Sequence, residues 1–193
     1  MHVTSNGFSY CRRIALFCCA IFCSALSVFS KGVLVECEHF SNKGGWVVDQ
    51  QFTHLMGSSY LMAHGMGIPV ADATTQVSLP KRGNYHIYVR TYNWTSPWSD
   101  NEGAGAFQVG IDGSLLTEKL GTSGKQWEWQ KAGTVTLKNK SCMLTLHDLT
   151  GFNGRCDAIY FTQNEQEQPP TIEMRKQSKE AKAIRKFALR HPH

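Results

Sequence analysis

Four tryptophans occur where an aromatic ring could bind a ligand. Trp94 and Trp98 lie in one proline-containing loop, and Trp127 and Trp129 are two residues apart, so that they would share one face of a strand. A planar indole can stack on the apolar C–H face of a sugar while polar side chains bond its hydroxyl groups. The alternative is structural, because large aromatic side chains also fill sandwich cores. Trp46, which follows a glycine pair, is assigned to packing.

The segment HDLTGFNGRCD contributes a second group of polar residues. Asp148, Asn153 and Arg155 supply the donors and acceptors that a hydroxyl-rich ligand requires, and Arg155 is the first candidate for ligand contact. Asn153-Gly154 is also a turn signal. The structural alternative is therefore a turn in which Arg155 pairs with Asp148 or Asp157.

No complete catalytic constellation is found in the sequence. Dinucleotide binding requires a G-x-G-x-x-G turn between a strand and a helix. The first glycine cluster, at 65–67, runs into Ile68-Pro69, and the second, at 103–105, precedes a strand, so both indicate loops. G-x-S-x-G, H-E-x-x-H and, after residue 30, C-x-x-C are also missing. We therefore expect no catalytic residue, no FAD site and no enzyme activity in this chain.

Short β-type runs must position these side chains. Between Val33 and Thr162 they are separated by Gly, Asn, Asp and Pro, and they read VLVEC, TTQVSL, YHIYVRTY, AFQVGI, GTVTL, CMLTLHDL and DAIYF. This spacing is typical of an all-β sandwich. We predict an antiparallel jelly-roll β-sandwich over residues 31–162, with no helix of normal length before residue 165.

Two of these runs carry more specific signals. YHIYVRTY alternates, with the odd-numbered positions from Tyr85 to Thr91 on one face, which predicts a strand with one side in the core. VGIDGSLL has Asp112-Gly113 between two apolar runs, which predicts a tight hairpin.

The C-terminal part, residues 163–193, differs in composition. Residues 163–170 are polar and end in proline, which indicates a linker. SKEAKAIRKFALR then predicts a short basic helix with Ile184, Phe187 and Ala188 on one side. Such a helix could cap the sandwich, stay disordered or begin a further domain.

The N-terminus has the order of a secretory signal. Arg12 and Arg13 precede the apolar stretch from Ile14 to Phe29, and we expect cleavage after Ser30. The signal peptide would then be residues 1–30, and the protein would be exported to the periplasm or the extracellular space, with no membrane attachment after removal of the signal. A retained membrane anchor is the alternative, although this run is shorter than the about 20 apolar residues that span a bilayer.

The net charge of +5 does not indicate nucleic-acid binding. Residues 31–162 carry eleven Lys and Arg against eleven Asp and Glu, and the excess lies in the two terminal segments. Because the body of the chain is neutral, it lacks the basic surface that a nucleic-acid partner requires.

Three cysteines remain after the predicted cleavage: Cys37, Cys142 and Cys156. An oxidising compartment permits one disulfide and one thiol, and Cys37 with Cys156 is the pair that we expect, because each lies in a terminal strand. Three buried reduced thiols are the alternative, since free cysteine packs as a small apolar residue.

Several blocks of the sequence carry a resemblance to known families. VECEHF, GNYHIYVRTYNW and GRCDAIYF resemble the pattern of galactose-binding-like carbohydrate-binding modules. GGWVVDQQF, MGSSYLMAHGMGIPVADATT and HDLTGFNGRCDAIYF more closely resemble the N-terminal module that precedes the flavin domain in certain exported FAD-dependent oxidoreductases. The resemblance covers about residues 33–162 and the charged helix, and the flavin domain itself is absent from the sequence.

The first resemblance also implies a structural calcium ion. In related modules, two acids on the first strand and one on the last often hold such an ion, and here these positions correspond to Glu36, Glu38 and Asp157. Calcium takes six to eight oxygen ligands, so backbone or amide oxygens would have to complete the shell. The alternative is an edge strand with solvated acids.

The sequence therefore supports two functions. The first is a non-catalytic module that binds glycan by aromatic stacking and hydrogen bonds to hydroxyl groups. The second is an accessory domain that docks on a flavin-binding catalytic domain and has no ligand of its own.

Overall fold

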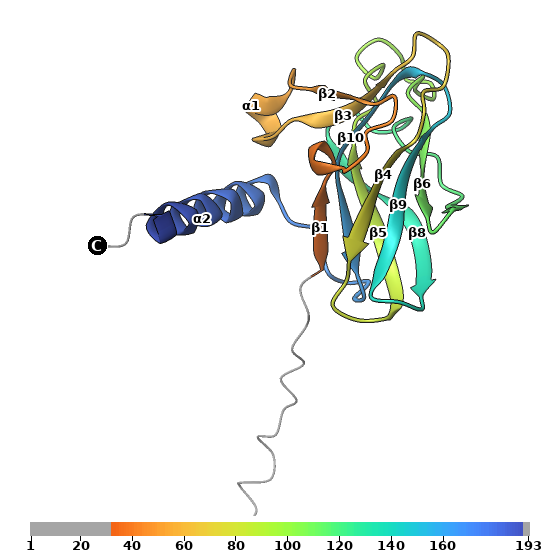
Figure 1. Cartoon of the computed structure of the whole chain (residues 1–193). Coiled ribbons are helices and arrows are strands. Elements are labelled where there is room, and N and C mark those ends of the chain that lie inside the picture. The colour runs from red at the N-terminus through yellow and green to blue at the C-terminus, as the bar shows by residue number, and fades with distance from the viewer. Residues whose placement is uncertain (1–31, 191–193) are drawn as a thin grey trace, which may run out of the picture. The chain divides into compact units, whose positions relative to one another are not determined.

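The computed structural model describes residues 32–190, where two antiparallel sheets lie face to face as a β-sandwich (Figure 1). The larger sheet runs β2 (Val47–Asp49), β3 (Tyr60–His64), β10 (Phe152–Thr162), β5 (Gly83–Thr91) and β8 (Glu128–Leu137), with β1 (Val33–Glu36) also paired to β10. The smaller sheet runs β4 (Ala73–Ser78), β9 (Ser141–Asp148), β6 (Phe107–Ile111) and β7 (Ser114–Leu115). The helices are η1 (Cys37–His39), α1 (Thr53–Met56) and α2 (Ile172–Arg190). The prediction of an antiparallel all-β sandwich with a C-terminal helix is confirmed.

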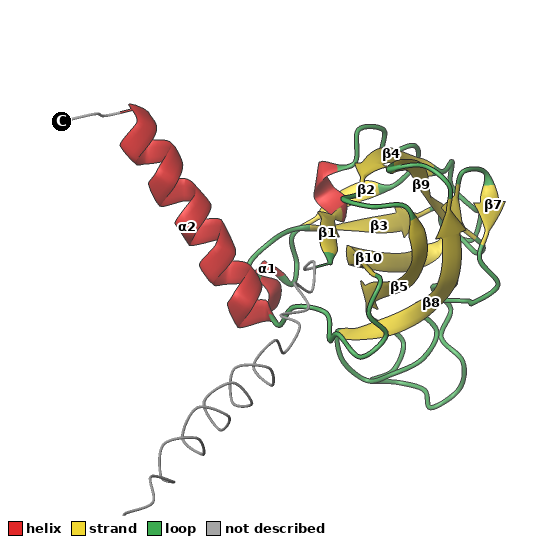
Figure 2. Ribbon diagram, turned by 90° about the horizontal axis from the view of Figure 1, so that it is seen from below, coloured by secondary structure: helices red, strands yellow, loops and turns green. Residues whose placement is uncertain are grey.

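The core lies between the two sheets, whose layers are visible in Figure 2. From β5, Tyr85, Ile87 and Val89 point inward with at most 2% of each residue exposed, as the alternation predicts. Residues of the smaller sheet meet them, among them Val109 and Leu144. Each such side chain stabilises the fold by about 1.5–3 kcal/mol, because its apolar surface leaves water.

β10 is the central strand of the larger sheet and carries two irregularities. Its register shifts between Phe152 and Gly154 against β3, and between Cys156 and Ala158 against β5. A bulge adds one residue to one strand and so changes which face the following side chains occupy. Cys156 and Ile159 therefore both face the interior, although residues an odd number of positions apart would face opposite sides of a regular strand.

The hairpin between β6 and β7 is confirmed. Ile111 pairs with Ser114, and the two turn residues have positive φ, 50° at Asp112 and 82° at Gly113. Left-handed conformations at both positions are what a type I′ turn requires. The glycine clusters at 65–67 and 103–105 lie in loops, also as expected.

Two strands were not predicted from the sequence. β2 has three residues, two of them exposed, and β3 carries the run YLMAH, which shows no regular alternation. β3 pairs with the first half of β10, whereas β1 pairs with the second half, so both lie along the same edge of that strand. Their place in the sheet depends on β10 rather than on a local pattern.

α2 follows a linker, covers the whole of the predicted basic segment at 178–190 and begins six residues before it. The predicted amphipathic character of the helix depends on Ile184, Phe187 and Ala188. These three side chains are not among those that the structure describes. Among residues 32–190, no helix is long and apolar enough to cross a membrane. The predicted signal peptide, residues 1–30, lies outside the described residues.

Candidate functional site

Trp94 and Trp98 lie together on one rim of the sandwich, in the loop between β5 and β6. Their ring centroids are 6.2 Å apart and the rings meet edge to face. Trp98 is 77% exposed, whereas the indole N–H of Trp94 donates a hydrogen bond of 2.8 Å to the carbonyl of Phe152. Trp94 is thus fastened to β10, and Trp98 presents its ring to solvent.

Buried Asn93 orders this loop. Its side-chain oxygen accepts hydrogen bonds from the backbone N–H and the hydroxyl of Thr95, at 3.2 and 2.8 Å. Its amide nitrogen donates to the carbonyl of Thr122, so the neighbouring loop before β8 is held as well. Backbone N–H groups of Trp98 and Ser99 both donate to the carbonyl of Thr95, which closes the turn that carries the exposed ring.

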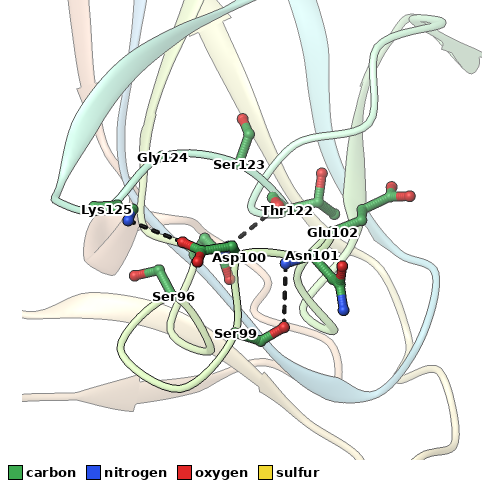
Figure 3. A pocket seen from close by; sticks show the side chains of 10 residues that line it. Ser96, Ser99, Asp100, Asn101, Glu102, Thr122, Ser123, Gly124 and Lys125 are labelled. Carbon is green, nitrogen blue, oxygen red and sulfur yellow. Dashed lines mark hydrogen bonds and ion pairs between the residues drawn. The ribbon is translucent and has the colours of Figure 1, made fainter.

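A cavity of about 380 Å³ opens between these two loops (Figure 3). Its lining is polar and comprises Asn93, Ser96, Ser99, Asp100, Asn101, Glu102, Thr122, Ser123, Gly124 and Lys125. Asp100 and Lys125 form an exposed ion pair of 2.9 Å, which lowers the pKa of Asp100 and raises that of Lys125. None of these residues was predicted from the sequence as a site residue. The polar runs SDNE and TSGK could have indicated them.

Arg155 lies at this rim but does not face solvent. It is 7% exposed, and its guanidinium carbon lies 5.4 Å from the ring centroid of Trp94. It donates to the carbonyl of Asn153, and its Nε is buried without a partner. The alternative, an ion pair with Asp148 or Asp157, is not formed, and the role of Arg155 as the first ligand contact stays a prediction.

Asn153 stands in the bulge of β10 with a φ of 57°, which agrees with the turn signal. Its side-chain oxygen lies 2.6 Å from Nδ1 of His64 on the paired strand. The side chain is partly exposed, so it can still contact a ligand at the rim.

Asp148 lies in the interior, and its contact with a ligand stays a prediction. It is 1% exposed, and its carboxylate accepts hydrogen bonds from the backbone N–H groups of Val70, Thr150 and Gly151. These bonds join the loop before β4 to the turn before β10. The carboxylate needs no further partner.

Trp127 and Trp129 lie on the outer face of the larger sheet, apart from the other pair. Trp127 contacts Phe52, Tyr60 and Tyr92, with the ring of Tyr92 stacked at 5.7 Å. A second cavity of about 380 Å³ lies beside Trp127. Its lining comprises Phe52, Leu55, Arg90, Tyr92, Lys125, Gln126 and Trp127. Trp129 instead packs edge to face on Tyr160. Ligand contact by Trp127 and Trp129 stays a prediction, and Trp129 also packs on a neighbouring ring.

The acids proposed as metal ligands gather as expected, but around cationic side chains. Arg175 of α2, 3% exposed, donates to both Glu36 and Asp157. Arg90 adds an ion pair of 3.1 Å to Asp157. The remaining acid, Glu38, lies 3.9 Å from Lys179, whose ammonium group is 3.4 Å from Glu36. Neither arginine was predicted to join these acids, since neither is near them in the sequence.

This cluster does not fit a calcium ion. Every carboxylate oxygen of the cluster except one of Glu38 already has a guanidinium or ammonium partner, and a divalent ion would have to displace these partners. Burial disfavours the charge of Arg175, but the carboxylates of Asp157 and Glu36 outweigh that effect and raise its pKa above the ordinary value. Within the described residues, no three His, Cys, Asp or Glu side chains are placed to hold a metal ion.

Comparison with known proteins identifies the fold. No family model and no curated protein matches the sequence. Among solved structures, a GH26-CBM35 β-(1,4)-mannanase of Podospora anserina matches with a TM-score of 0.55 and 18% identity, over 72% of this chain and 29% of that chain. A family 35 carbohydrate-binding module from Clostridium thermocellum matches with a TM-score of 0.53 and 15% identity, over 68% of this chain and 98% of that one.

A third match is the CBM36-1 domain of a multidomain xylanase from the hindgut metagenome of Trinervitermes trinervoides. Its TM-score is 0.50 with 13% identity, over 69% of this chain and 98% of that domain. The chain has the β-sandwich fold of carbohydrate-binding modules. The two structures that are covered over 98% of their own length are themselves carbohydrate-binding modules. None of the three is described as a flavin enzyme, so the finer resemblance to FAD-dependent oxidoreductases stays a prediction.

Proposed function

We propose that this chain is a non-catalytic glycan-binding module of an exported protein, and that the rim formed by the loops after β5 and before β8 is its binding surface. The observation that carries the proposal is Trp98, an indole exposed by 77% on an ordered turn whose residues Ser96 and Ser99 line a polar cavity. A large apolar ring that is held out of the core costs solvation free energy, which a ligand stacked on it would recover.

The polar lining of the cavity complements such a ring. Ser96, Ser99 and Asn101 offer hydroxyl and amide groups, and Glu102 offers a carboxylate, which together match the donors and acceptors of sugar hydroxyls. Asp100 and Lys125 neutralise each other, so the cavity has no strong excess of positive charge. A neutral glycan therefore fits it better than an acidic one.

The test is a glycan array followed by calorimetry with the best ligand. Trp98→Ala removes the stacking surface and should weaken binding by about tenfold or more, while Trp98→Phe retains part of it. Leu115→Ala is the matched control, because Leu115 is another exposed apolar residue, 46% exposed on β7 in the smaller sheet. Binding that is unchanged in the double variant Trp94→Ala, Trp98→Ala would exclude the rim as the site.

Trp127→Ala tests whether the second cavity, and not only the rim, contacts the ligand. If the outer face of the larger sheet also contacts the ligand, this substitution weakens binding in the same assay. If glycan is held at the rim alone, the affinity stays within about twofold of the wild type, a change near 0.4 kcal/mol.

A docking role is the second candidate, and the anchoring of α2 favours it. This helix is fastened to the sandwich through buried Arg175, so it would fix the orientation of whatever protein follows or packs against it. A flavin-binding catalytic domain is the partner that the sequence resemblance implies. A coding sequence downstream with a G-x-G-x-x-G motif between a strand and a helix, and no binding on glycan arrays, would favour docking over glycan binding.

A further inference from the structure

Two buried cysteines from opposite ends of the sandwich sequence meet in its interior. Cys37 and Cys156 are separated by 119 residues, yet their sulfur atoms lie 3.3 Å apart. Both residues are 0% exposed. The third described cysteine, Cys142, is also buried but lies on β9 in the other sheet and contacts neither sulfur.

The fold brings this pair together through two local features. β1 pairs antiparallel with β10, with Glu36 opposite Ala158, so Cys37 at the start of η1 arrives beside the middle of β10. The register shift between Cys156 and Ala158 turns the Cys156 side chain toward the interior. Both thiols consequently face the same side of the larger sheet.

A small movement would allow a covalent bond. The sulfur atoms of a disulfide are about 2.05 Å apart, so this pair must approach by about 1.3 Å, which side-chain rotation can supply. The thiols already contact each other without an intervening side chain, and neither has another hydrogen-bond partner among the described residues.

We propose that Cys37 and Cys156 form a disulfide that joins β1 to β10 when the chain folds in an oxidising compartment, and that Cys142 stays a thiol. The oxidant is an external disulfide, such as oxidised glutathione. The thiolate of one cysteine attacks a sulfur of the oxidant, forming a mixed disulfide and releasing one thiol. The second cysteine then attacks its partner's sulfur and releases the second thiol. Two electrons pass to the oxidant, and the two protons leave on its thiols.

The order of events follows from burial. An external disulfide cannot reach sulfur atoms that are fully enclosed, and burial, together with the contact to Cys156, raises the pKa of Cys37 well above its ordinary value. The reactive thiolate is therefore scarce in the folded chain. The bond must form before the sandwich closes, and once formed it is shielded from reductants.

The test uses the full chain, unfolded in denaturant and refolded with oxidised and reduced glutathione, and the cross-linked peptides are assigned so that any bond to the four cysteines of residues 1–30 is distinguished from the bond between Cys37 and Cys156. Thiols are alkylated with one reagent in denaturant, the protein is reduced, and the newly exposed thiols are alkylated with a second reagent. Peptide mass spectrometry then assigns the label at each site. We expect the second label on Cys37 and Cys156 and the first label on Cys142.

Melting temperatures provide an independent measurement. Closing a loop of 119 residues restricts the unfolded chain, so reduction before refolding should lower the melting temperature by on the order of 10 °C. Cys142→Ser should keep this dependence on reduction, and the double variant Cys37→Ser, Cys156→Ser should lose it. The Cys142 variant is the matched control, because it also removes one buried thiol.

Two results would overturn the proposal. One is the first label on both Cys37 and Cys156 after oxidative refolding, which would mean that the thiols stay reduced. The other is a cross-link that involves Cys142. Both are read from the wild-type protein, so the proposal remains testable even if a serine variant fails to fold. Because neither measurement uses a ligand, the result is separate from that of the glycan-binding test.

Discussion

At the level of single residues, burial decides what a polar side chain does. Asp148 and Arg155 have the chemistry that a sugar site needs, but the fold uses the first to hold backbone N–H groups and the second to support the ring of Trp94. Buried polar groups must find partners within the protein, since an unpaired one costs about 1–3 kcal/mol. Trp98, which has no such constraint, keeps its surface available.

Glu38 is the residue whose protonation should affect stability. Burial, and the negative charge of Glu36 to a smaller degree, raises its pKa above the ordinary value, and one of its oxygens has no partner. The folded state then binds the proton more tightly than the unfolded state, so this group's contribution to stability is present at low pH and is lost as pH rises through the folded pKa.

Glu38→Gln should therefore stabilise the protein at pH 7, by about 0.5–1 kcal/mol in urea unfolding. Near pH 4 the carboxyl of the wild type is largely protonated and the difference should disappear. Exposed Glu118→Gln is the matched control and should change little at either pH. An equal effect of Glu38→Gln at both pH values would show that its charge is not the cause.

At the level of elements, backbone hydrogen bonds join the turn before β10 to a neighbouring loop. The carbonyl of Gly151 accepts hydrogen bonds from the backbone N–H groups of Gly65 and Gly67, which joins the turn before β10 to the loop before β4. Gly151 has a φ of +67°, and a Cβ there would lie 2.1 Å from the carbonyl oxygen of Ile68. Glycine is required at this position for both backbone conformation and space.

Gly151→Ala and Gly113→Ala form a matched pair that separates these two requirements. Gly113 also has a positive φ, +82°, but a Cβ there meets nothing within 4 Å. Gly113→Ala should lower the free energy of unfolding by about 1 kcal/mol from backbone strain, and Gly151→Ala by at least about 2 kcal/mol more from the clash. Similar losses of unfolding free energy for the two variants would mean that the turn before β10 and the loop before β4 can move apart to accommodate the added Cβ.

At the level of the whole molecule, ion pairs hold α2 to the first and last strands. Arg175 comes from α2, Glu36 from the first strand, and Asp157 from the last. Replacing one partner of a buried pair leaves the other charge uncompensated, which typically costs 3–5 kcal/mol.

Arg175→Ala should therefore lower the free energy of unfolding by about 3 kcal/mol. Lys182→Ala removes the same charge from an exposed position on α2 and should stay within about 0.5 kcal/mol of the wild type. Calcium or a chelator should leave the melting temperature of the wild type unchanged. A rise with calcium would show that the cluster binds metal in spite of Arg175, and equal effects of the two substitutions would show that α2 is not anchored by Arg175.

The sequence by itself determined the fold class, because alternation as in β5 and the Asp112-Gly113 turn are local patterns with local causes. It also placed Trp94 and Trp98 in one loop, but it left open whether Cys37 and Cys156 pair or stay reduced. Tertiary structure alone decided the register of β10, whose bulges determine which of its side chains, Arg155 among them, are buried. It alone brought Arg175 to Asp157 and Glu36, because contacts between distant segments depend on how the sheet pairs and have no signature in any short stretch of sequence.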